Sequence, residues 1–152
     1  MWYNLSSKIF NPPRFFYLFP KGGISMDSKE FHSLRQKLQK TQKQMSQLLG
    51  TSLKAVQSFE QGWRKVPVHV ERQVLFLRAL KRGKGKDSRP CWDIRACPLP
   101  TRQACPAWEF NVGHLCWFIN GTICQGKAQE SWSKKMKVCR KCEVFSANMK
   151  PA

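Results

Sequence analysis

Apolar residues recur at helical spacing between residues 28 and 80, with polar residues between them. Asp27 or Ser28 can cap a first helix, and Pro67 suits the first position of a last one. The inward positions of these two helices would be Phe31, Leu34, Leu38, Val70, Val74, Leu77 and Leu80. The pattern therefore predicts a small helical core in this part of the chain.

The stretch Thr41–Gly62 predicts two short helices joined by a tight turn. Thr41 and Gln44 form a Thr-x-x-Gln capping box at the start of the first helix. Gly50 can take a positive φ and end that helix, and the Thr51-Ser52 pair that follows supplies an N-cap for the second. The apolar residues expected to pack inward are Met45, Leu48, Leu49, Ala55, Val56 and Phe59.

The outward face of the second of these helices is polar and carries little acid. It comprises Leu53, Lys54, Gln57, Ser58 and Gln61. The whole chain has 27 Lys and Arg residues against 9 Asp and Glu, a formal charge of +18, and the basic excess is concentrated in residues 26–90. A charge of this size favours polyanions, meaning nucleic acid or an anionic membrane surface.

The cysteines divide the chain, because all seven lie between Cys91 and Cys142. Residues 81–90, KRGKGKDSRP, are basic, contain two glycines and end in proline, which is typical of a linker. We therefore expect a helix bundle over 26–80, a small irregular cysteine-rich domain over 91–146 and a disordered tail over 147–152. No stretch approaches the ~20 apolar residues of a membrane-spanning helix. Clustered thiols without a secretion signal favour a reducing cytoplasm.

Residues 1–25 have two interpretations. Lys21-Gly22-Gly23 can be encoded by a sequence that resembles a bacterial ribosome-binding site, and Met26 follows shortly after. Translation from Met26 would make residues 1–25 a non-native extension, whereas a start at Met1 would make them a flexible aromatic arm. The intact mass of the native protein distinguishes the two.

Residues 29–80 resemble the phage-repressor and Cro type of helix-turn-helix domain, the XRE-like family. The residues that carry the likeness are Leu34-Arg35, Leu38, Thr41-Gln42, Met45-Ser46, Leu48-Leu49-Gly50, Ser52, Ala55-Val56, Ser58, Glu60, Gly62, Arg64 and Pro67. The resemblance implies an all-α helix-turn-helix bundle of four or five helices whose third helix enters the major groove of double-stranded DNA. Repressors of this type commonly bind as dimers, so a homodimer is expected.

The same resemblance implies roles for individual residues. Ser52, Leu53, Lys54 and Ser58 would face base edges, with Gln57 beside them. Thr41, Gln42, Arg64 and Lys65 would hold phosphates. Arg35 and Glu60 would form a buried ion pair between two helices. Trp63 departs from the family pattern, and its ring would pack either on the sugar–phosphate backbone or as a lid over the core.

The cysteine region resembles the two-CW domain, a cysteine-rich module attached to sensors and regulators. The likeness rests on Cys91-Trp92, Cys97, Cys105-Pro106-Ala107, Cys116-Trp117, Gly121-Thr122, Cys124-x-Gly126 and Cys139-x-x-Cys142. All seven cysteines are candidate metal ligands, namely Cys91, Cys97, Cys105, Cys116, Cys124, Cys139 and Cys142. The likeness does not identify what they bind.

Several chemistries fit these thiols. An iron–sulfur cluster would take four thiolates, whereas zinc would take four, or all seven with His114 for two ions. A metal-free thiol switch would use a pair such as Cys139 and Cys142. Disulfides are a further possibility, although an odd number of cysteines cannot be fully paired within one chain.

The sequence contains no Ser/His/Asp set, paired carboxylates or phosphate-binding glycine loop, so we predict no enzymatic activity. The favoured function is a cytoplasmic, sequence-specific transcriptional regulator that binds DNA and carries a C-terminal cysteine-rich module for a metal or cluster. Two alternatives remain: a metal-binding adaptor whose helical unit contacts protein, and an iron–sulfur redox protein whose basic half docks on an acidic partner.

Overall fold

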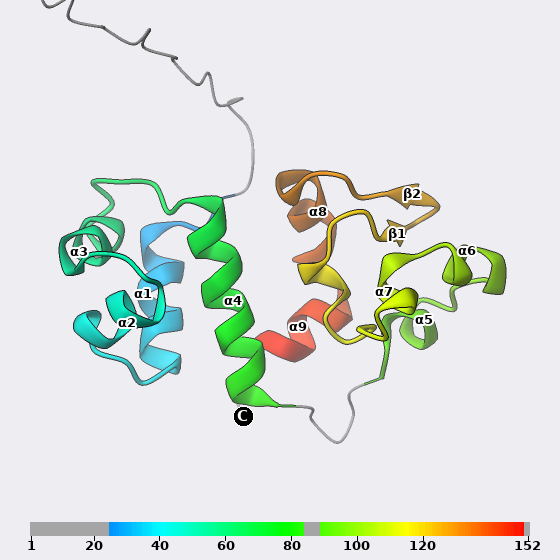
Figure 1. Cartoon of the computed structure of the whole chain (residues 1–152), viewed down its shortest axis with the longest axis horizontal. Helices are drawn as coiled ribbons and strands as arrows, with labels where there is room; N and C mark the ends of the chain where they lie inside the picture. Colours follow the sequence, from blue (N-terminus) through cyan, green and yellow to red (C-terminus); the bar gives the residue numbers. More distant parts are fainter. Residues whose placement is uncertain (1–24, 84–88, 151–152) are drawn as a thin grey trace, which may run out of the picture.

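The computed structural model describes residues 25–83 and 89–150 and is mostly helical, with one tiny two-stranded sheet (Figure 1). Its first region contains α1 (Ser28–Lys37), α2 (Gln42–Leu48), α3 (Leu53–Glu60) and α4 (Val68–Arg82). Its second contains α5 (Cys91–Ile94), α6 (Leu99–Gln103), α7 (Pro106–Glu109), the 3-10 helix η1 (Cys116–Phe118), β1 (Ile123–Cys124), β2 (Lys127–Ala128), α8 (Trp132–Cys139) and α9 (Glu143–Met149). This confirms the mainly α-helical class.

The element boundaries differ from the sequence interpretation at two places. α4 continues two residues into the expected linker, to Arg82, and Gly83, whose φ is +72°, follows as its C-cap. α9 runs to Met149 and so enters the segment 147–152 that we expected to be disordered, because its Val144 and Phe145 are buried. Residues 84–88 of the linker lie outside the described residues. So do residues 1–24, which belong to the protein only if translation starts at Met1.

The helices of the first region begin where the sequence predicts N-caps. The Asp27 carboxylate accepts the backbone N–H of Glu30 at 2.8 Å. Thr41 and Gln44 form both hydrogen bonds of a capping box, and the Ser52 hydroxyl accepts the backbone N–H of Ala55 at 3.1 Å. Gly50 has a φ of +60° and Gly62 a φ of +74°. These local signals are confirmed.

Most of the predicted inward residues do form the core of the first region. Phe31 and Phe59 meet edge to face at 5.7 Å between ring centroids, and Val56 and Val74 are fully buried. Leu80 differs, since it is 56% exposed near the end of α4. Leu48, at the end of α2, is also largely exposed. The predicted core therefore extends less far along α2 and α4 than the apolar pattern suggests.

Short helices, rather than irregular loops, make up most of the cysteine region. Its small sheet pairs Ile123 with Ala128 in antiparallel register. Gly113 is required by packing, because a Cβ atom there would lie 2.6 Å from the Trp92 ring and 2.7 Å from Pro90. The Gly113 carbonyl also accepts the backbone N–H of Cys91 at 2.9 Å. These contacts hold α5 against the chain that precedes η1.

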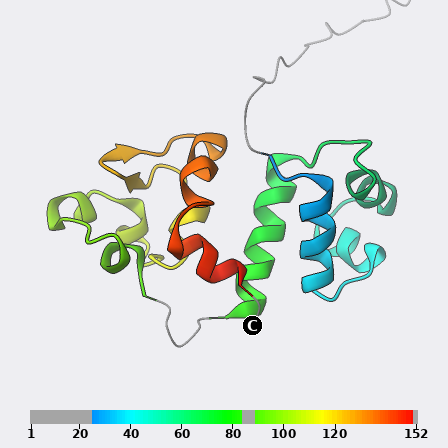
Figure 2. The ribbon, with the colours of Figure 1, turned by 180° about the vertical axis from the view of Figure 1, so that it is seen from behind.

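The two regions pack against each other along α4, beside which α9 lies in both views (Figures 1 and 2). One hydrophobic core continues from α1–α4 into Trp117, Trp132 and Phe145. The Phe118 ring stacks on Phe76 of α4 at 4.8 Å. The first and second halves of the chain are therefore joined by buried side chains as well as by the connecting segment.

Candidate functional site

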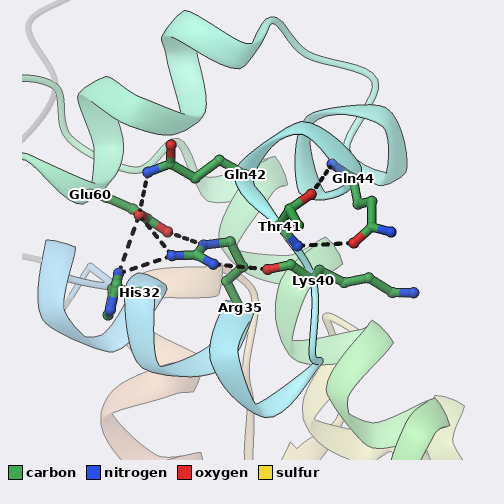
Figure 3. Close-up of polar contacts among 7 residues, drawn as sticks. All are labelled: His32, Arg35, Lys40, Thr41, Gln42, Gln44 and Glu60. Carbon is green, nitrogen blue, oxygen red and sulfur yellow. Dashed lines mark hydrogen bonds and ion pairs between the residues drawn. The ribbon is translucent and has the colours of Figure 1, made fainter.

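An ion-pair cluster fixes the end of α3 against α1 and α2 (Figure 3). Arg35 donates through Nε to Glu60 Oε1 and through Nη2 to Glu60 Oε2, the latter at 3.1 Å. Its Nη1 donates to the Lys40 carbonyl at 2.8 Å, and His32 Nδ1 lies 3.2 Å from Glu60 Oε2. The predicted Arg35–Glu60 pair is confirmed, whereas His32, which appears isolated in the sequence, belongs to the same cluster.

This cluster keeps the Glu60 carboxylate charged. Burial of the side chain opposes ionisation, but hydrogen bonds from Arg35, Gln42 and His32 outweigh it and lower the pKa of Glu60. The Glu60 side chain is only 5% exposed. Its negative charge is therefore neutralised inside the first region and is not presented on the outer face of α3.

The outer face of α3 is open to solvent. Ser52, Leu53, Lys54 and Gln57 are exposed, as expected for residues that would contact a partner. Ser58 is different: it is 8% exposed, and its hydroxyl donates to the Lys54 carbonyl at 2.8 Å. The structure therefore does not support Ser58 as a contact residue, because its polar group is already used within the helix.

The residues predicted to hold phosphates also divide into two kinds. Thr41, Arg64 and Lys65 are exposed. The Gln42 side chain instead donates through Nε2 to Glu60 Oε2 at 2.7 Å (Figure 3), so this amide is engaged in the buried cluster. The bond uses one N–H of the amide, so the phosphate contact of Gln42 stays a prediction, and its backbone N–H lies in the first turn of α2.

Trp63 is 78% exposed in the loop after α3. A lid over the core would be covered on one face, so this exposure excludes that interpretation of Trp63. The neighbouring Arg64 lies over the Phe59 ring, with its guanidinium carbon 5.8 Å from the ring centroid. The loop therefore adds an exposed indole beside two exposed cations at one end of α3.

Five of the seven cysteines line one partly open cavity of about 240 Å³ in the second region. They come from α5, the loop after it, the start of α7, η1 and β1, and are Cys91, Cys97, Cys105, Cys116 and Cys124. Trp92, Trp108, Arg95 and Arg102 also contribute to the wall. Cys139, Cys142 and His114 are not among the residues that line this cavity, so the structure does not gather all the predicted ligands around it.

The thiols around the cavity have unequal electrostatic surroundings. A hydrogen bond from Cys116 is the main cause that lowers the pKa of Cys91, and the same interaction raises the pKa of Cys116. Burial raises the pKa of Cys124. Outside the cavity wall, burial raises the pKa of Cys139 to about 11. The pKa of Cys91 is therefore lowered, whereas the pKa values of Cys116, Cys124 and Cys139 are raised.

Lys135 is a residue whose importance the sequence analysis missed. It lies on α8, is fully buried, and donates from Nζ to the Thr122 hydroxyl. Thr122 is part of the cavity wall. A signal was present in the sequence, because Lys135 shares the helical spacing of Trp132, Met136 and Cys139, which all face inward.

Two absences apply to the residues that the structure describes. In residues 25–83 and 89–150, no three His, Cys, Asp or Glu side chains are arranged to hold a metal ion. No helix in these ranges is both long enough and apolar enough to cross a membrane. Comparison of the chain with protein-family models, curated proteins and solved structures gave no match.

Proposed function

We propose that this protein is a sequence-specific DNA-binding transcriptional regulator. In this proposal α2 and α3 form a helix-turn-helix, and α3 reads base edges in the major groove of double-stranded DNA. The observation that carries it is the outer face of α3, where Leu53, Lys54 and Gln57 are exposed while the single carboxylate of the helix, Glu60, is turned inward and paired.

The chemistry of this face suits a nucleic acid. Lys54 can donate to guanine O6 and N7, Gln57 can bond an adenine edge, and the Leu53 side chain can contact a thymine methyl group. Arg64 and Lys65, at the other end of the helix, would pair with phosphates and contribute salt-dependent affinity. The net charge of +18 supports the same partner. A cytoplasmic homodimer would be the acting form, with the cysteine region modulating its affinity.

A charge-reversal experiment tests the proposal. Fluorescence anisotropy would measure binding of the full chain to duplexes selected from a random pool and to the DNA upstream of its own gene. We expect affinity for the selected site to fall at least 100-fold in Lys54→Glu, since a cation is replaced by an anion against base edges. Lys141→Glu makes the same change in net charge on an exposed residue of the second region and should weaken binding far less.

The salt dependence of the binding constant distinguishes contacts to base edges from contacts to phosphates. Each phosphate neutralised by a cation contributes about −0.9 to the slope of log K against log salt concentration. Replacement of both Arg64 and Lys65 by Gln should therefore reduce the slope by about 2 while leaving the preferred sequence unchanged. Equal affinity of the wild type and Lys54→Glu for the selected site would contradict the proposal and favour a protein-contact role for the helical region.

A further inference from the structure

Lys135 occupies an unusual position for a lysine. Its side chain is fully buried on α8, and its ammonium group donates to a neutral hydroxyl, that of Thr122. Among the described residues, no carboxylate lies within ion-pair distance of Lys135. Because burial of an unpaired charge is strongly unfavourable, a negatively charged group next to Lys135 would stabilise the folded protein.

Lys135 lies next to the cavity that five thiols line. Cys139 follows it by about one helical turn on α8, and Cys91, Cys116 and Cys124 are among the residues that line the cavity. Thr122, which accepts the Lys135 hydrogen bond, also lines the cavity, two residues before Cys124. The Lys135 ammonium group is therefore connected, through the Thr122 hydroxyl, to a cavity that five cysteines line.

The charged residues that line the cavity are also positively charged. Arg95 and Arg102 line the cavity, and no Asp or Glu is among its described lining residues. A site with three cations and five thiols favours a ligand that converts the thiols to thiolates and leaves a net negative charge. Metal ions do this, because a thiol loses its proton when it coordinates a metal.

We propose that this cavity binds a negatively charged metal–thiolate centre, held by four of the five cavity cysteines, with Lys135 as its buried counter-charge. Four thiolates around one Zn²⁺ carry a net charge of −2, and an iron–sulfur cluster uses the same four-thiolate ligand set. Because no three of the described His, Cys, Asp or Glu side chains are arranged to hold a metal ion, ligation requires the cysteine side chains around the cavity of about 240 Å³ to rearrange. This assignment does not rest on DNA reading by α3, and its test uses no DNA.

The test compares two neighbouring lysines of α8. The full chain and its variants would be purified without oxygen, and bound iron, zinc and acid-labile sulfide would be measured before and after incubation with Fe²⁺ and sulfide or with Zn²⁺. We expect Lys135→Met to release metal to a chelator at least tenfold faster than the wild type. Lys134→Met, which removes the same charge from an exposed position, should behave like the wild type.

A stability measurement distinguishes loss of the counter-charge from a failure to fold. Without metal, Lys135→Met should unfold at the same or a higher temperature than the wild type, because the substitution removes an unpaired buried charge. With metal, the order should reverse, and Lys135→Arg should restore metal retention because it keeps the charge. Unfolding of Lys135→Met at a lower temperature in the metal-free state would overturn the counter-charge role.

Serine substitutions of single cysteines test the ligand set. Four of the five cavity variants should lose the centre, while Cys139→Ser and Cys142→Ser should retain it. Brown protein with sulfide indicates an iron–sulfur cluster, and colourless protein with one zinc per chain indicates a single ion; either supports the proposal. A wild type that binds neither after both incubations, or whose cavity thiols are recovered as disulfides, overturns it. Equal metal retention in Lys135→Met and Lys134→Met would also overturn the proposal.

Discussion

The first three helices and the remainder of the molecule treat their buried polar groups differently. Among the described residues, every buried side-chain nitrogen or oxygen that lacks a hydrogen-bond partner lies on α4 or later, for example Glu71 Oε2, Arg78 Nε and Trp132 Nε1. In α1–α3 the caps and the Arg35–Glu60 cluster satisfy such groups with residues close by. None of the described unsatisfied side-chain atoms therefore lies in α1–α3.

The unsatisfied atoms occur where α4 meets the cysteine region and inside that region. Arg140, just after α8, donates to Glu30 at 2.6 Å and to the fully buried Glu71 at 3.0 Å. Lys135 has a hydroxyl for a partner, with a cavity beyond it. This difference shows that α1–α3 satisfy most of their buried polar groups within themselves, whereas the cysteine region pairs Arg140 with carboxylates of α1 and α4.

Arg140→Met gives the largest expected effect on stability. The Glu71 carboxylate would remain fully buried with neither oxygen paired, and loss of one member of a buried ion pair costs about 3–5 kcal/mol. Urea denaturation followed by circular dichroism measures the change. Because one hydrophobic core spans both regions, we expect a single transition at lower urea concentration.

Two comparison variants make this result interpretable. Lys141→Met changes the next residue, which is exposed, and should shift the free energy of unfolding by less than about 0.5 kcal/mol. Addition of Glu71→Leu to Arg140→Met should recover much of the loss, because the buried charge is removed with its partner. If Arg140→Met melts the cysteine region in a separate transition, the two regions are independent and the shared core does not couple them.

Glu60→Gln should have a smaller effect, within the self-contained part of the molecule. The substitution keeps the shape of the side chain but weakens the bonds from Arg35, and Arg35 retains the Lys40 carbonyl as an acceptor. Hydrogen bonds to charged groups contribute about 1.5–3 kcal/mol each, so we expect a loss of about 2 kcal/mol in urea denaturation. Glu130→Gln, in an exposed loop, should be neutral. A loss larger than that of Arg140→Met would reverse the ranking.

The sequence predicts α1–α3 well because their signals are local. Capping residues act within three positions, and glycine at a helix end acts at one, so Thr41, Ser52, Gly50 and Gly62 could be assigned without knowledge of the fold. Ser58 shows the limit of this reasoning. It follows Ala55 by three residues and precedes Phe59, so helical spacing places it on their buried face rather than among the outward residues.

The cavity could not be predicted in the same way. Its cysteines come from α5, from the loop that follows α5, from the start of α7, from η1 and from β1, and their meeting depends on contacts such as Gly113 against Trp92 that no local pattern encodes. From the sequence all seven cysteines are candidate metal ligands, with Cys139 and Cys142 distinguished only as a possible thiol switch, and the structure separates these two from the five that line the cavity. Lys135 could have been found from its spacing, but three lysines within α8 suggest an exposed face.

The smallest expected effect is a pH dependence that belongs to α1–α3. The folded protein lowers the pKa of Glu60, because the hydrogen bonds from Arg35, Gln42 and His32 outweigh the opposing effect of burial. A carboxyl group whose pKa is lower in the folded state stabilises the protein above its unfolded pKa, near 4.5, and this contribution is lost as the pH falls through the folded pKa. The free energy of unfolding of the wild type should therefore decline below about pH 4.5.

In Glu60→Gln, the difference in unfolding free energy from the wild type should shrink over the same pH range, since the amide does not titrate. Urea denaturation of both proteins from pH 7 to pH 3 measures this convergence. Parallel curves down to pH 3 would mean that Glu60 keeps its proton equilibrium unchanged on folding, and the self-contained ion-pair cluster would then rest on hydrogen-bond geometry rather than on charge.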